Sequence, residues 1–159
     1  MVITLKYLSC FLFLNAWLLF NSSNYCQAQF SNLVTFEQND LGRLPTTSLI
    51  TDGNFLYGMT TLGGDHNGGV IFRVRPDGSE YNNLFHFSQE SGRNPRGSLL
   101  LNGGYLYGMT EFGGANQYGT IFKMNLSGTE YTKLFDFESV STGGLPKGSL
   151  IFDARICTA

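Results

Sequence analysis

Two short stretches of the sequence carry side chains that could take part in chemistry. Asp65, His66 and Asn67 are adjacent in "GGDHNGG", and their carboxylate, imidazole and amide are groups that bind metal ions or transfer protons. The second stretch, "GGANQYG", offers Asn116 and Tyr118 but has neither the acid nor the imidazole. Three neighbouring loop residues rarely complete a metal site by themselves. We therefore predict no metal and no cofactor, and treat these five residues as candidate ligand-binding loop positions.

Other catalytic patterns receive little support from the sequence. His86 is replaced by Asp136 fifty positions later and by Thr35 in an earlier fragment, so we expect a strand residue with a structural role. There is no nucleophile elbow, HExxH, P-loop or CxxC motif. The acids lie mostly beside turns, although a glycosidase with two carboxylates distant in sequence stays possible. We assign no catalytic residue and consider a non-enzyme the better interpretation.

Aromatic residues, at 14% of the chain, could serve as platforms for carbohydrate stacking. Most of them recur at strand spacing, which indicates core packing. Tyr118 has no aromatic counterpart at Gly68, so it is the best candidate for a surface aromatic.

The elements that must position these residues follow from an internal repeat. When residues 45–87 are aligned with residues 95–137 at an offset of 50, 20 of 43 pairs are identical. Each unit contains four strand-like runs separated by turn signals, near 48–51, 55–60, 69–74 and 81–87 and again fifty residues later. In the fourth run we expect Leu84 to face away from Phe85 and Phe87, which would give the sheet two apolar faces.

A period near 50 with four antiparallel strands predicts an all-β, propeller-like protein with one blade per repeat. We divide the chain into a signal peptide (1–28), the last strand of a partial repeat (29–44), repeat one (45–94), repeat two (95–145), the start of a third repeat (146–153) and a divergent tail (154–159). Because closed propellers need about four to eight blades, we expect an incomplete, open fragment whose exposed edges can self-associate.

The first 28 residues have the features of an export signal. Lys6 precedes the apolar run "LSCFLFLNAWLLF", and the small residues Cys26 and Ala28 occupy positions suited to cleavage after Ala28. We predict a secreted or cell-surface protein whose mature chain has no membrane span. An uncleaved anchor is the alternative.

The motifs P-x-G-S-L, L-Y-G-M-T-x-x-G-G, G-(V/T)-I-F and G-(S/T)-E-Y-x-x-L-F-x-F resemble the GloVer repeat of secreted bacterial choice-of-anchor proteins, over about residues 33–153. The resemblance implies propeller-like units in long tandem arrays and no established catalytic residues. A weaker likeness to kelch repeats rests on the period and the double glycine.

Charge narrows the choice of partners. A net charge of −2 and the absence of any basic stripe argue against nucleic acid. We expect a non-catalytic module for extracellular binding or adhesion, with a polysaccharide or a surface protein as partner. The alternative is a fragment of an exported carbohydrate-active hydrolase or lyase.

Overall fold

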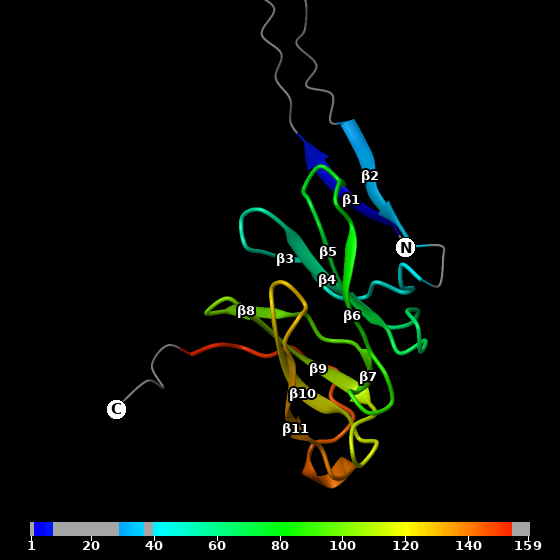
Figure 1. Ribbon diagram of the computed structural model, residues 1–159, viewed down its shortest axis with the longest axis vertical. Coiled ribbons are helices and arrows are strands. Elements are labelled where there is room, and N and C mark those ends of the chain that lie inside the picture. Colours follow the sequence, from blue (N-terminus) through cyan, green and yellow to red (C-terminus); the bar gives the residue numbers. More distant parts are fainter. Residues whose placement is uncertain (1, 8–28, 37–39, 154–159) are drawn as a thin grey trace, which may run out of the picture.

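The computed structural model describes residues 2–7, 29–36 and 40–153, and these form an all-β protein (Figure 1). Its regular elements are eleven strands and one 3₁₀ turn, η1 (Val140–Thr142). None of the described segments is a helix long and apolar enough to cross a membrane. The predicted cleavage site after Ala28 and the predicted tail at 154–159 lie outside the described residues, and so the export signal stays a prediction.

The first repeat forms a four-stranded antiparallel sheet in the order β3-β4-β5-β6. Its strands are β3 (Ile50–Thr51), β4 (Leu56–Thr60), β5 (Val70–Val74) and β6 (Asn82–His86). Each strand falls inside one of the runs expected from the sequence, so the strand prediction is confirmed. Asp52 closes the first hairpin, because its Oδ1 accepts hydrogen bonds of 2.8 Å from the amides of Asn54 and Phe55.

The second repeat builds the same sheet fifty residues later. Its strands are β8 (Leu100–Asn102), β9 (Tyr105–Phe112), β10 (Thr120–Asn125) and β11 (Tyr131–Asp136). Register is conserved between the sheets: Ile50 opposes Tyr57 in the first, and Leu100 opposes Tyr107 in the second. An added strand, β7 (Arg93–Pro95), pairs with the end of β9 and was not expected from the sequence.

A β-bulge overturns one prediction about the fourth strand of each repeat. The register shifts between Ile71 and Phe72, which pair with Phe85 and Asn83, and Leu84 is left without a partner on β5. Leu84 and Phe85 both pack against the same core cluster. The prediction that Leu84 faces away from Phe85 is therefore wrong, because an extra residue in one strand breaks strict alternation.

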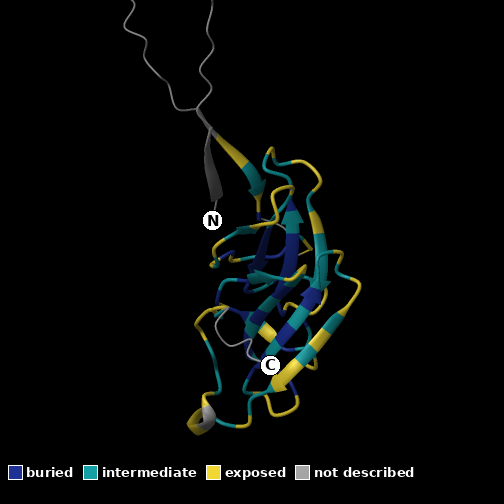
Figure 2. Cartoon of the chain, turned by 90° about the vertical axis from the view of Figure 1, so that its left-hand side faces the viewer, coloured by how far each residue is buried: buried dark blue, intermediate teal, exposed yellow. Residues whose placement is uncertain are grey.

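The main core lies between the two sheets. It contains residues from both repeats: Tyr57, Met59, Ile71, Phe87, Leu99, Leu106, Phe122 and Met124. Figure 2 shows these buried strand centres in dark blue and the exposed hairpin tips in yellow. Tyr57 and Met59 are only 1% exposed, as expected for core residues of an inner strand. Their counterparts Tyr107 and Met109 are only half-buried, because within the described residues no further sheet covers that face.

The other face of the first sheet is covered by β2 (Gln29–Thr35) and by Phe36, which follows β2 in the chain. Strand β2 does not pair with any strand of the first sheet. Strand β1 (Val2–Tyr7) pairs antiparallel with β2. Phe36 packs on Phe72 and Tyr81, with ring centroids 5.2 and 6.0 Å away. The same arrangement of three rings recurs between the two sheets in Phe87, Phe122 and Tyr131. Each sheet-to-sheet junction is thus built from the same aromatic set.

Candidate functional site

The loops that carry the candidate residues join the second and third strands of each repeat, at 61–69 and 113–119. The same three backbone hydrogen bonds hold both loops. They are Gly69 N to Gly63 O, Phe87 N to Gly69 O and Asn94 N to Gly68 O in the first, and Gly119 N to Gly113 O, Phe137 N to Gly119 O and Leu145 N to Tyr118 O in the second. The loop backbone is therefore a repeated framework.

Paired glycines start each loop because the chain turns through positive φ there. Gly63 and Gly64 have φ of 86° and 73°, and Gly113 and Gly114 have 77° and 79°. Such angles are strained for other residues. Space is also short, since a Cβ on Gly64 would lie 2.6 Å from Val70 Cγ1. The double glycine of the repeat motif is thus a requirement of the turn.

His86 anchors the first loop. Its Nδ1 accepts a hydrogen bond of 3.0 Å from the Asp65 amide, and in the second repeat Asp136 Oδ1 accepts one of 2.8 Å from the Ala115 amide. The Asp65 carboxylate also lies 3.1 Å from the same nitrogen. One nitrogen cannot donate to the carboxylate and accept from the amide together. The amide bond is the one that the second repeat reproduces, which gives His86 a positioning role.

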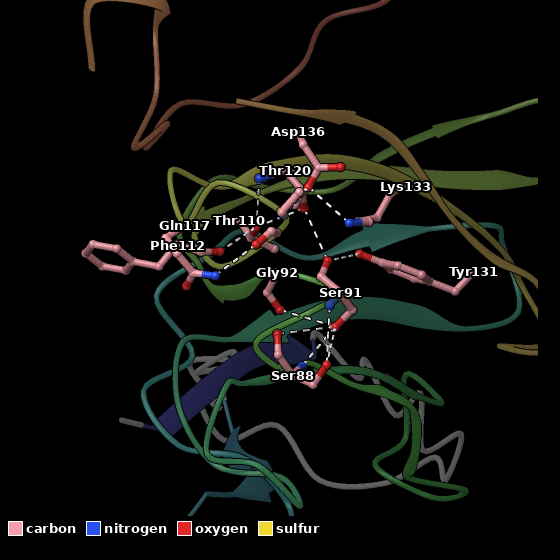
Figure 3. A network of polar contacts seen from close by, with 12 residues as sticks. Ser88, Ser91, Gly92, Thr110, Phe112, Gln117, Thr120, Tyr131, Lys133 and Asp136 are labelled. Carbon is pink, nitrogen blue, oxygen red and sulfur yellow. Dashed lines mark hydrogen bonds and ion pairs between the residues drawn. The ribbon is translucent and has the colours of Figure 1, made fainter. Parts of the chain in front are cut away.

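In the second repeat, Asp136 takes the anchoring position that His86 has in the first. Burial acts to raise the pKa of its carboxyl, but the Ala115 amide and the Lys133 ammonium, 3.0 Å away, outweigh burial and lower the pKa. Figure 3 shows this group beside a polar network in which Tyr131 reaches Ser91. The Tyr131 hydroxyl donates to the Ser91 carbonyl at 2.6 Å. These contacts fasten the linker between the repeats to the second sheet.

Three polar depressions lie beside the first loop and the linker between the repeats, and together we call them the loop-edge groove. The first, of about 600 Å³, is lined by Arg43, Gly64, Asp65, His66 and Asn67. The second, of about 420 Å³, is lined by His66, Ser88, Gln89, Glu90 and Arg93. The third, also about 420 Å³, is lined by Ser88, Glu90, Ser91, Tyr131 and Lys133. Neighbouring depressions share lining residues, so the three depressions adjoin one another.

The structure brings three of the five candidate residues together. Asp65, His66 and Asn67 line one depression, and all three are exposed. Asn116 is exposed on the equivalent loop of the second repeat, and Tyr118 is half-buried where its side chain passes Gly144. Neither residue lines the groove. Among the described residues, no cluster of three or more His, Cys, Asp and Glu side chains could hold a metal ion.

Comparison with known families shows what kind of repeat this is. Residues 20–155 match the model of the Gloeobacter/Verrucomicrobia repeat. The chain belongs to this repeat family. The match agrees with the resemblance found in the sequence motifs, whereas the likeness to kelch repeats has no support. A comparison with curated proteins finds no match.

Within this Gloeobacter/Verrucomicrobia repeat, sequence reasoning missed the arginines of the groove. Arg43 and Arg93 occupy equivalent positions in "GRLP" and "GRNP", fifty residues apart. Both form short pairings at the sheet end: Arg43 bridges to Leu62, and Arg93 in β7 opposes Phe112. The recurrence of G-R-x-P was a readable signal, but it lies partly outside the aligned block that starts at Pro45.

Proposed function

We propose that the chain is an exported, non-catalytic repeat module that binds an extracellular polysaccharide through the loop-edge groove. The observation that carries the proposal is the contrast between framework and side chains in the two loops. The backbone bonds of the loops are the same in both repeats, whereas residues 65–68 read Asp-His-Asn-Gly and residues 115–118 read Ala-Asn-Gln-Tyr. A constant scaffold with variable exposed side chains is typical of a recognition surface.

The stacking of the sheets supports a propeller-like arrangement of blades. The amide of Ser48 donates to Ser98 Oγ at 3.1 Å, and the amide of Ser98 donates to Ser149 Oγ at 2.8 Å. These serines begin successive repeats, so the first strands lie in series along one side of the stack (Figure 1). We propose that this side corresponds to the inner wall of an incomplete propeller and that the loop-edge groove crosses one end of its blades.

A glycan array combined with a reducing-sugar release assay on the recombinant chain tests the function. We expect binding without turnover, weakened by His66→Ala and unchanged by Glu130→Gln, an exposed acid on the β10–β11 hairpin at the opposite end of the sheet. Turnover that is abolished by Asp65→Asn or His66→Ala would establish the carbohydrate-active enzyme instead. A chain that binds no glycan at all also contradicts the proposal.

A further inference from the structure

The shape of the loop-edge groove is suited to an extended ligand. Its first and second depressions share His66 as a lining residue, and its second and third share Ser88 and Glu90. A compact small molecule would fill one depression only. A polymer can occupy all three with successive units, as polysaccharides do in open grooves.

Arg43 contributes a guanidinium group to the first depression. One of its terminal nitrogens, Nη2, donates to Asn67 Oδ1 at 3.3 Å, and that oxygen also accepts from the Gly63 amide at 3.0 Å. The Arg43 Nε is buried and has no hydrogen-bond partner among the described residues. Because Arg43 lines the first depression, its guanidinium gives the wall of that depression a positive charge.

Arg93 places a second guanidinium on the second depression. Its guanidinium carbon lies 5.8 Å from the Phe112 ring centroid, which helps to orient it. Arg75 and Arg96 each form an ion pair with a glutamate, but within the described part of the chain neither Arg43 nor Arg93 contacts a carboxylate within ion-pair distance. No described carboxylate therefore neutralises either of the two equivalent guanidinium groups.

The remaining lining groups set a limit on the ligand's charge. Asp65 and Glu90 lie in the same depressions as the two arginines, and Lys133 is already paired with Asp136. A densely charged polyanion would meet repulsion from these acids. Hydroxyl groups of neutral sugars, by contrast, can donate to the acids and bond to Asn67, Ser88 and Gln89.

We propose that the groove binds a carboxylated polysaccharide of low charge density, in which uronate units alternate with neutral sugars. The guanidinium groups of Arg43 and Arg93 receive uronate carboxylates, because the planar fork of arginine matches a carboxylate with two parallel hydrogen bonds. Asp65, Asn67 and Glu90 contact the hydroxyls of the neutral units. This inference rests on the proposed binding function and specifies its ligand class.

Isothermal titration calorimetry with three soluble oligosaccharides tests the inference. The probes are an oligosaccharide of alternating glucuronate and N-acetylglucosamine, the same oligosaccharide with its carboxyls reduced to alcohols, and a neutral cello-oligosaccharide. We expect the carboxyl-reduced probe to bind at least about tenfold more weakly than the acidic one. Added salt should weaken binding of the acidic probe and leave binding of the two neutral probes unchanged.

Three variants separate the guanidinium contacts from a general effect of charge. Arg43→Gln and Arg93→Gln should each weaken binding of the acidic probe about tenfold or more. Arg93→Lys should recover only part of the loss, because a lysine cannot make the two-bond contact. Arg75→Gln is the control, since it removes the same charge from the opposite hairpin, where Arg75 pairs with Glu80. Thermal melts verify that each variant is folded.

The outcomes distinguish this inference from the proposed function. If the carboxyl-reduced probe or the cello-oligosaccharide binds as tightly as the uronate probe, the chain remains a binding module and the ligand class proposed here is wrong. Equal losses from Arg75→Gln and Arg93→Gln would likewise overturn it. If no glycan binds under any condition, the binding function itself fails.

Discussion

Tyr131 of β11 stacks on Phe85 of β6, with ring centroids 4.0 Å apart and an interplanar angle of 5°. The two residues belong to different repeats, and their contact joins the two sheets. The Tyr131 hydroxyl also donates to the Ser91 carbonyl at 2.6 Å, as Tyr81 does to the Leu41 carbonyl at 2.6 Å. One side chain therefore packs the junction and fastens the linker that precedes it.

The first prediction concerns this tyrosine. Tyr131→Ala should lower the free energy of unfolding by about 3–5 kcal/mol, because it removes a large, partly buried ring that packs against the core and leaves a cavity. Tyr131→Phe keeps the ring and removes one hydrogen bond, so a loss of about 1 kcal/mol is expected. Urea denaturation measures both values. Tyr105→Phe, outside the junction, is the control, and a Tyr131→Ala variant as stable as that control would contradict the packing role.

The second prediction concerns the glycine of "LYGMT". A Cβ on Gly58 would lie 2.6 Å from Phe72 Cζ and 2.7 Å from Leu49 Cδ2. Gly58→Ala should therefore destabilise the chain by about 1–3 kcal/mol through overpacking. Gly148→Ala is the matched control, because a Cβ added at Gly148 would have no neighbour within 4 Å. In the double variant Gly58→Ala with Phe72→Leu, the combined loss should be smaller than the sum of the two single losses.

The sequence periodicity was sufficient to predict the strands, but it did not predict the residues of the groove. The offset of 50 located every main strand, because recurring apolar residues and turn glycines are fixed by the same contacts in both repeats. Strand β7 was missed because three residues ending in proline give no strand signal. Leu84 was assigned to the wrong face because alternation cannot reveal a bulge. The position of Arg43 and Arg93 in the groove could be recognised only from the structure, which places them beside the 61–69 loop and the linker between the repeats.

Glu111 is a further residue that the repeat could not reveal, since its counterpart is Thr61. Its side chain is only 5% exposed, and it pairs with Arg96 and with Lys147, whose Nζ lies 3.2 Å away. In the first repeat the same place holds a hydrogen bond of 3.0 Å between the hydroxyls of Thr46 and Thr61. The charged set thus joins the second repeat to the segment at 146–153.

The third prediction is the pH dependence of this charged set. Burial acts to raise the pKa of Glu111, but hydrogen bonds from Arg96 and Lys147 outweigh burial and hold the pKa below its ordinary value of 4.5. A lowered folded-state pKa stabilises the fold above about pH 4.5, and this contribution is lost as the pH falls through the folded-state value. The stability difference between wild type and Glu111→Gln should therefore be largest near neutral pH and shrink below about pH 4.5.

Thermal melts from pH 7 to pH 3 measure this difference. Glu130→Gln, which changes an exposed glutamate, is the control and should keep the pH profile of the wild type. A Glu111→Gln variant that loses stability in parallel with the wild type across the whole range would show that the carboxylate contributes nothing to the junction.

The last prediction concerns the uncovered face of the second sheet. Leu134 and Phe135 are 49% and 50% exposed there, and Phe152 is 53% exposed beside them. An apolar depression of about 330 Å³ on this face is lined by Leu134, Phe152 and their neighbours. The equivalent residues of the first sheet, Leu84 and Phe85, are partly buried against the second sheet. Because the same face buries apolar surface wherever a sheet covers it, we expect copies of the chain to associate through it.

Sedimentation velocity should show a concentration-dependent rise in mass that Leu134→Lys abolishes. Leu44→Lys is the matched control, since Leu44 is 52% exposed at the other end of the repeat array. A chain that stays monomeric at all concentrations, or equal effects of the two lysine variants, would refute the expectation.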